Sequence, residues 1–145
     1  MINKLTIEAV ELLKKLIATQ SFSGEENETA LLIMQWFSHH NIQFESDKHN
    51  VWAKNKHFDP SKKTILLNSH HDTVKPNKGY TRNPFGPTIE DGKLYGLGSN
   101  DAGGCLVSLL ATFTYFYNRE DLKYNFVIVA SAEEENSGPN GLNSM

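Results

Sequence analysis

The chain has 145 residues, of which 39% are hydrophobic and 21% are charged, and its formal net charge is −3 at pH 7. These values are typical of one soluble globular domain, and the weakly negative charge gives no indication of a nucleic-acid-binding surface. No apolar run approaches the about 20 residues of a membrane span, and the N-terminus lacks the apolar segment of a signal peptide. The single cysteine, Cys105, excludes an intrachain disulfide. We therefore predict a cytoplasmic protein without a nucleic-acid or membrane partner.

Two amphipathic helices are predicted at the start of the chain. Apolar residues recur at three- and four-residue spacing over residues 5–17, with charged residues between them. A second helix is expected from Glu25 to about Asn41. Ser23 and Glu26 have the spacing of a capping box, in which the two side chains would satisfy the free N–H groups at the start of that helix.

Strands are predicted next. Residues 42–45 and 50–54 alternate in polarity and are expected to form a hairpin. The apolar run Thr64–Asn68 predicts a buried strand. Residues 73–93 are rich in proline and glycine, which predicts a long irregular loop, and loops of this length usually carry function.

The last third of the chain predicts a glycine-rich turn over residues 96–104, an apolar helix over 106–117 and a second buried strand over 126–130. Helices that alternate with apolar strands are typical of βαβ units. We therefore predict an α/β fold with three α/β/α layers and a largely parallel central sheet.

Groups that bind metals follow the predicted strands. On a strand His70 and Asp72 would point to the same face and His71 to the opposite one, so that Asp72 could orient a metal-bound His70. Asp101 lies in the glycine-rich turn, and three glutamates, residues 133–135, follow the last strand. Zinc and harder divalent ions accept such a mixture of imidazole and carboxylate ligands.

Each group alone also has an ordinary structural explanation. His70 and Asp72 could be a hydrogen-bonded pair, Asp101 a helix cap, and residues 133–135 a solvated loop. Their occurrence together, at three predicted edges of the sheet, favours a metal site. A phosphate-binding turn is disfavoured because Asp101 stands where the anion would lie and no P-loop lysine follows. The apolar helical setting of Cys105 favours packing over a nucleophilic role.

Three strings carry a resemblance to a known family: LLNSHHDTVK, NPFGPTIEDGKLYGLGSNDAGG and ASAEEENSG. In order and spacing they resemble the metal-site motifs of the family that contains acetylornithine deacetylase, succinyl-diaminopimelate desuccinylase, aminoacylase and glutamate carboxypeptidase. The chain looks closest to acetylornithine deacetylase. The resemblance implies a zinc-exopeptidase-like fold in which residues 1–145 are the N-terminal part of the catalytic domain.

The resemblance also implies a cofactor, two divalent metal ions, most simply zinc. His70 would bind one zinc, with Asp72 behind it, and Asp101 would bridge the two ions, with a cis peptide bond to Ala102 that is typical of the family. The family's acidic motif pairs a general base with a zinc ligand. The run of glutamates at residues 133–135 leaves this register open by one residue, and alignment on the family pattern makes Glu134 the base and Glu135 the ligand.

The sequence departs from the family pattern at a few positions. Leu97 stands where the family often has arginine, Ala102 and Gly103 stand where it often has methionine and lysine, and Lys75 precedes the proline that usually follows valine directly. None of these departures removes a ligand.

The implied function is zinc-dependent amide hydrolysis, in which Glu134 takes a proton from water and passes it to the leaving amine. The expected substrate is a small N-acyl amino acid, first of all N-acetylornithine of arginine biosynthesis. The alternatives are a dipeptidase or carboxypeptidase of the same family, or a non-catalytic truncated module. Further zinc ligands and a lid domain that makes a homodimer are expected beyond Met145, so that this chain alone would have an incomplete metal site and no activity.

Overall fold

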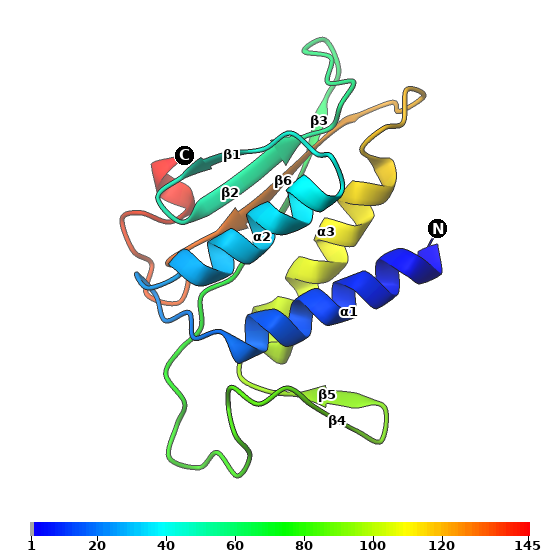
Figure 1. Cartoon of the computed structure of the whole chain (residues 1–145). Helices are drawn as coiled ribbons and strands as arrows, with labels where there is room; N and C mark the ends of the chain where they lie inside the picture. The colour runs from blue at the N-terminus through cyan, green and yellow to red at the C-terminus, as the bar shows by residue number, and fades with distance from the viewer. Residues whose placement is uncertain (1) are drawn as a thin grey trace.

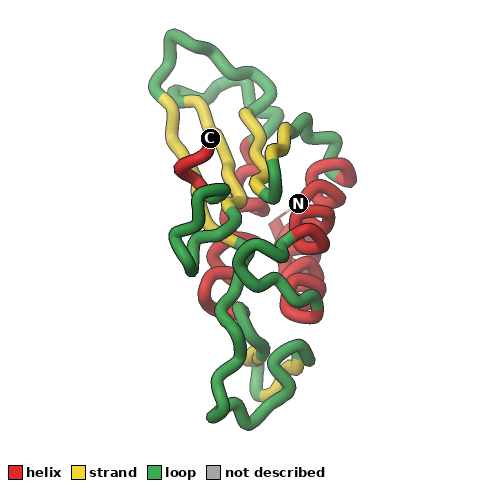
Figure 2. Tube along the Cα trace, turned by 90° about the vertical axis from the view of Figure 1, so that its left-hand side faces the viewer, coloured by secondary structure: helices red, strands yellow, loops and turns green. Residues whose placement is uncertain are grey.

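Three helices lie on one face of a four-stranded sheet in the computed structural model, which describes residues 2–145 (Figure 1; Figure 2). The helices are α1 (Ile2–Ala18), α2 (Asn27–His39) and α3 (Cys105–Phe116). The strands, in the spatial order β1-β2-β6-β3, are β1 (Glu45–Asp47), β2 (Asn50–Lys54), β6 (Asn125–Ser131) and β3 (Thr64–His70). A separate hairpin of β4 (Thr88–Glu90) and β5 (Lys93–Tyr95) projects from one end, and a short 3-10 helix covers Leu142–Ser144.

The sheet is mixed. Strands β3 and β6 run parallel, with Thr64 opposite Asn125 and His70 opposite Ser131. Strands β1 and β2 form the predicted hairpin, and β2 joins β6 in the antiparallel direction. The predicted α/β class is thus confirmed, but parallel pairing is confined to β3 and β6. Within residues 2–145 helices cover only one face of the sheet, so two of the three predicted layers are present.

The core lies between the helices and the sheet. It contains apolar side chains from all three helices and from β2 and β6, whose most deeply buried members are Ile33, Phe37, Val51, Leu106, Leu110, Phe113, Ile128 and Ala130. Helix α1 packs against α3 and α2, and α3 and α2 pack against the strands. The three- and four-residue spacing predicted these helices because it gathers apolar side chains on the face that meets the sheet.

The predicted capping box is wrong. Helix α2 begins at Asn27, and no side chain caps it. The Ser23 hydroxyl donates instead to Asp72, and the Glu26 carboxylate accepts the N–H group of Gly24 and makes further contacts described below. Ser23 is thus bound by a residue that is distant in the sequence, and Glu26 adds the distant donors His49 and Glu133 to its local contact with Gly24.

The first strand of the hairpin is also displaced from the prediction. It covers Glu45–Asp47 rather than residues 42–45, because the Ile42 N–H donates to the carbonyl of Phe37 at the end of α2 and the Gln43 N–H donates to Tyr117. The predicted loop over residues 73–93 contains β4 and ends at the first residue of β5, and the sequence analysis missed this hairpin. Its turn has Asp91 and Gly92 at positive φ, and an Asp-Gly pair is a known hairpin signal. Among residues 2–145, no helix has both the length and the apolar character needed to cross a bilayer.

Candidate metal centre

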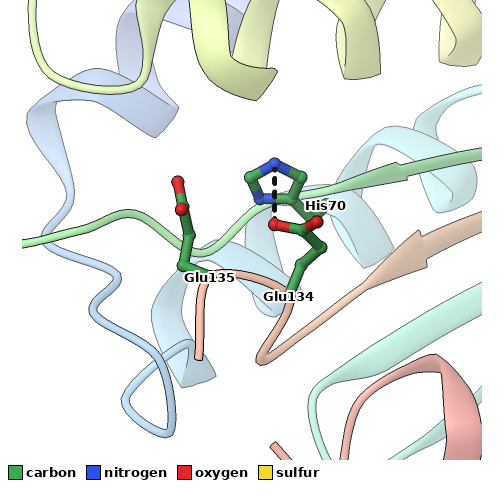
Figure 3. Close-up of side chains that lie close together, drawn as sticks. All are labelled: His70, Glu134 and Glu135. Carbon is green, nitrogen blue, oxygen red and sulfur yellow. Dashed lines mark ion pairs between the residues drawn. The ribbon is translucent and has the colours of Figure 1, made fainter. Parts of the chain in front are cut away.

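The candidate site lies where β3 and β6 end. Because the two strands are parallel and His70 pairs with Ser131, their carboxyl ends meet at one edge of the sheet. His70 is the last residue of β3, and the segment after β6 carries Glu134 and Glu135 to the same place (Figure 3). Ligands commonly bind at this edge in α/β proteins.

Four predicted side chains converge there. His70, Glu134 and Glu135 each offer one ligand atom, and these atoms lie within 4.8 Å of one another. His70 Nε2 is 3.2 Å from Asp101 Oδ1 and 3.6 Å from Glu134 Oε2. The His70 side chain is 10% exposed, whereas those of Asp101 and Glu134 are 79% and 58% exposed, so the carboxylates face solvent around a buried imidazole.

Asp101 comes from the turn Ser99–Gly104, which leads into α3. The Asp101–Ala102 peptide bond is cis, as the resemblance implied. The carbonyl of Gly98 accepts the N–H of Gly103 at 2.9 Å and closes this turn. The turn therefore presents Asp101 to His70 Nε2, the same nitrogen that Glu134 approaches.

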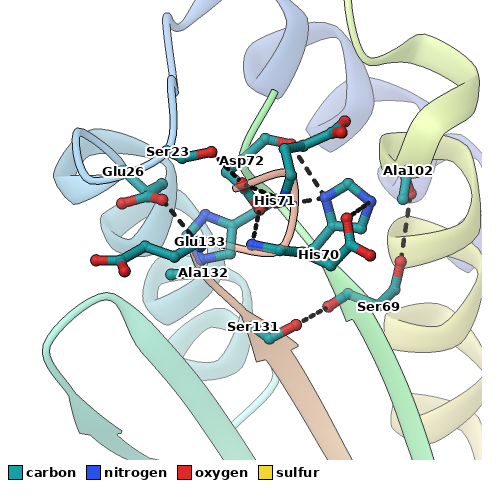
Figure 4. A network of polar contacts seen from close by, with 12 residues as sticks. Ser23, Glu26, Ser69, His70, His71, Asp72, Ala102, Ser131, Ala132 and Glu133 are labelled. Atoms are coloured by element: carbon teal, nitrogen blue, oxygen red, sulfur yellow. Dashed lines mark hydrogen bonds and ion pairs between the residues drawn. The ribbon is translucent and has the colours of Figure 1, made fainter. Parts of the chain in front are cut away.

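Asp72 lies behind the site and is completely buried. Its carboxylate accepts the Ser23 hydroxyl at 2.6 Å and the N–H groups of Glu134 and Glu135 at 3.1 and 3.0 Å, and His70 Nδ1 is 3.2 Å from Oδ1. Burial acts to raise the pKa of Asp72, but hydrogen bonds from these donors outweigh it and hold the pKa well below its usual range. Asp72 is thus a carboxylate that orients both the imidazole and the glutamate segment (Figure 4).

The electrostatics of the site favour a cation. The hydrogen bond with Asp72, opposed by burial and supported by Asp101 and Glu134, raises the pKa of His70 to about 9. Burial raises the pKa of Glu135. No lysine or arginine within residues 2–145 forms an ion pair with Asp101, Glu134 or Glu135. One imidazole nitrogen and several carboxylates without a lysine or arginine partner are a donor set that fits zinc or a similar divalent ion, which would displace the proton from His70.

His71 points away from this site, as strand alternation predicts. Its Nε2 donates to the carbonyl of His49 at 3.0 Å, and its Nδ1 lies 2.9 Å from the Thr29 hydroxyl. Burial lowers the pKa of His71 to about 4. The ring is therefore neutral at pH 7 and bonds within the interior rather than facing the candidate site.

Glu133 also points away. Its side chain is buried, and its carboxylate accepts the backbone and side-chain N–H groups of Asn140 at 3.1 and 2.9 Å. Only Glu134 and Glu135, of the three consecutive glutamates, lie beside His70. Sequence analysis missed Ser23 as a partner of Asp72, since no local signal links residues this far apart.

Comparisons with known proteins agree on a single family. The family model described as "Peptidase family M20/M25/M40" matches residues 66–145. Succinyl-diaminopimelate desuccinylase of Wigglesworthia glossinidia brevipalpis is 31% identical over an alignment of 141 residues that covers 91% of this chain and 36% of that protein. Acetylornithine deacetylase of Shigella sonnei (strain Ss046) is 34% identical over an alignment of 143 residues that covers 88% of this chain and 36% of that protein.

The fold is likewise shared with solved structures. Human carnosine dipeptidase 1 superposes with a TM-score of 0.72 at 22% identity, and the match covers 92% of this chain and 33% of that one. The chain thus spans about a third of the length of the curated relatives and of this structural neighbour.

Proposed function

The chain belongs to the peptidase family M20/M25/M40, and from this premise we propose that its protein is a metal-dependent hydrolase that cleaves the amide bond of a small N-acyl amino acid. The observation that carries the proposal is the convergence of His70, Asp101, Glu134 and Glu135 at the carboxyl ends of two parallel strands. The names of the curated relatives suggest N-acetylornithine and N-succinyl-diaminopimelate as the first substrates to test.

We propose that His70, Asp101 and Glu135 hold the metal ions, with zinc as the expected metal because the donors combine imidazole and carboxylate. When bound, such ions lower the pKa of water and polarise a carbonyl group. Asp101 is the most exposed carboxylate of the set and approaches His70 from a separate segment, which suits a ligand shared by two ions. Asp72 keeps Nδ1 of His70 engaged and so directs Nε2 toward the site.

Glu134 is the proposed general base. Its carboxylate is more than half exposed and 3.6 Å from His70 Nε2, so it can reach both the metal centre and solvent. In the proposed reaction Glu134 accepts a proton from the attacking water and then donates it to the amine that leaves. His70 must be deprotonated at Nε2 to bind metal, and this couples metal binding to proton release.

Two tetrahedral zinc ions need more ligands than these three residues provide. We therefore propose that residues 1–145 are the N-terminal part of the catalytic domain and that the protein takes further ligands from outside this range. We also propose that the full-length protein is a homodimer whose contacts come from residues outside this range.

The test is zinc stoichiometry coupled to hydrolysis, measured on the protein in its full natural length. N-acetylornithine, N-succinyl-diaminopimelate and a set of dipeptides would be compared as substrates. Zinc binding with release of acetate or succinate supports the proposal, and cleavage of dipeptides alone would move the substrate class to peptides. A protein that binds no zinc and cleaves none of these amides would refute it.

A further inference from the structure

A second buried carboxylate, Glu26, lies beside the candidate site without reaching it. Glu26 immediately precedes α2 and has no exposed surface. Its Oε1 accepts the N–H groups of Gly24 at 2.8 Å and of Glu133 at 3.0 Å, and its Oε2 accepts His49 Nδ1 at 2.6 Å. The donors from His49 and Glu133 tie the start of α2 to the β1–β2 turn and to the segment after β6. Figure 4 shows Glu26 beside Glu133.

The contact with Glu133 continues a pattern begun by Asp72. The backbone N–H of Glu133 donates to the Glu26 carboxylate. The next two backbone N–H groups, those of Glu134 and Glu135, donate to the Asp72 carboxylate. Three consecutive backbone donors are thus bound by two buried carboxylates. The side chains of Glu134 and Glu135 project toward His70 from this anchored backbone, while the side chain of Glu133 turns to Asn140.

The hydrogen bonds of Glu26 explain why a carboxylate occupies this position. A buried carboxylate is costly unless several donors satisfy it, and Glu26 has three. Hydrogen bonds to a charged acceptor are stronger than those between neutral groups, so Glu26 restrains the Glu133 backbone more firmly than a neutral side chain would. The side chain of His49 is 22% exposed, so this donor links the buried Glu26 carboxylate to the protein surface.

From this juxtaposition we propose that Glu26 is a positioning residue for the reaction: its carboxylate sets the backbone at Glu133 and thereby the placement of Glu134 and Glu135. The inference rests on the proposed function. It assigns Glu26 no contact with metal or substrate, and it predicts that loss of the carboxylate lowers kcat through the geometry of the segment that carries the base.

The experiment compares three variants of the full-length, zinc-loaded protein. Glu26→Ala removes the acceptor of the Glu133 N–H. Glu26→Gln keeps an oxygen for this N–H and offers an N–H group to His49 Nδ1, which can accept it as the other tautomer. Asn125→Ala is the matched control, since Asn125 is also buried and bonds across the chain to Asp59 and Lys62, but at the opposite end of β6.

We expect Glu26→Ala to lower kcat by about 10- to 100-fold with little change in KM, as is usual when a residue behind a metal site is removed. Glu26→Gln should restore most of the kcat, and Asn125→Ala should lose thermal stability but retain its kcat. A folded Glu26→Ala protein with the kcat of the wild type would overturn the proposal, as would a loss of kcat no greater than that of Asn125→Ala.

Amide hydrogen exchange provides a readout that does not depend on activity. Exchange at residues 133–135 should accelerate in Glu26→Ala and not in Asn125→Ala. If the wild-type protein hydrolyses no amide, the proposed function fails, and the exchange result alone decides whether Glu26 positions this segment. Unchanged exchange at Glu133 in Glu26→Ala would refute the positioning role even in an active enzyme.

Discussion

The Ser23 hydroxyl lies 2.6 Å from Oδ2 of Asp72, although 49 residues separate the two in the sequence. This contact brings the segment before α2 to the carboxyl end of β3. It also adds a donor to an aspartate that already binds the backbone of Glu134 and Glu135. The candidate site is thus supported from three parts of the chain.

Asp72→Asn should weaken zinc binding. The amide would turn an N–H group toward one of the donors that now surround the carboxylate, and it would no longer favour the correct orientation of His70. We expect an affinity loss of about 10- to 100-fold, measured by competition with a chromophoric chelator. Ser23→Ala removes one donor only and should have a smaller effect. Wild-type zinc affinity in Asp72→Asn would contradict this role.

The glutamates can be assigned by three parallel substitutions. Glu134→Gln should lower kcat by about 10²- to 10⁴-fold while zinc content is retained, because a general base is lost. Glu135→Gln should instead lower zinc content. Glu133→Gln should reduce thermal stability, since its carboxylate binds Asn140, and should leave kcat largely intact. If Glu133→Gln abolished kcat with zinc retained, the assignment of the base would shift by one residue.

The pH dependence of stability should show two opposite slopes in the metal-free protein. The pKa of His71 falls from 6.5 to about 4, because of burial. The unfolded chain then binds the proton more readily, so the free energy of unfolding should decrease as pH falls from 6.5 to 4, by on the order of 3 kcal/mol.

His70 acts in the other direction. Its pKa is raised to about 9, chiefly by Asp72, so its stabilising contribution is complete below pH 6.5 and is lost as pH rises toward 9. Together the two histidines predict maximal stability near pH 6.5, which denaturant titrations with a chelator present would measure. His57→Gln, at a histidine whose side chain is 38% exposed, is the control and should keep both slopes. Constant stability from pH 4 to 6.5 would rule out a buried neutral His71.

Gly103→Ala should destabilise the turn that presents Asp101. A Cβ atom at residue 103 would lie 2.6 Å from the Gly98 carbonyl oxygen and 2.7 Å from Leu13 Cδ1. The carbonyl cannot move freely, because it accepts the N–H of Gly103. We expect a loss of about 1–3 kcal/mol in the free energy of unfolding. Gly79→Ala meets only the flexible side chain of Asn77 and should cost less, and equal losses for the two variants would disprove the steric argument.

Much of the fold follows from local patterns in the sequence. Three- and four-residue spacing predicted the helices, and apolar runs predicted β3 and β6, because both patterns reflect which side chains must leave water. The β4–β5 hairpin was missed although its Asp91–Gly92 turn is a local signal. The capping box failed for another reason, because distant segments compete for its two side chains. Ser23 and Glu26 have capping-box spacing, but Asp72, His49 and Glu133 engage them instead.

By itself the sequence determined the identities of the candidate ligands, the opposite directions of His70 and His71, and the family resemblance. These depend on residue type, on the two-residue period of a strand and on the order of motifs. Only the tertiary structure decided that His70 lies opposite Ser131 and that Glu133 turns away while Glu134 and Glu135 face His70. The physical reason is that Asp72 and Glu26 bind three consecutive N–H groups of this segment, and these bonds exist only once α2, β3 and β6 have packed together.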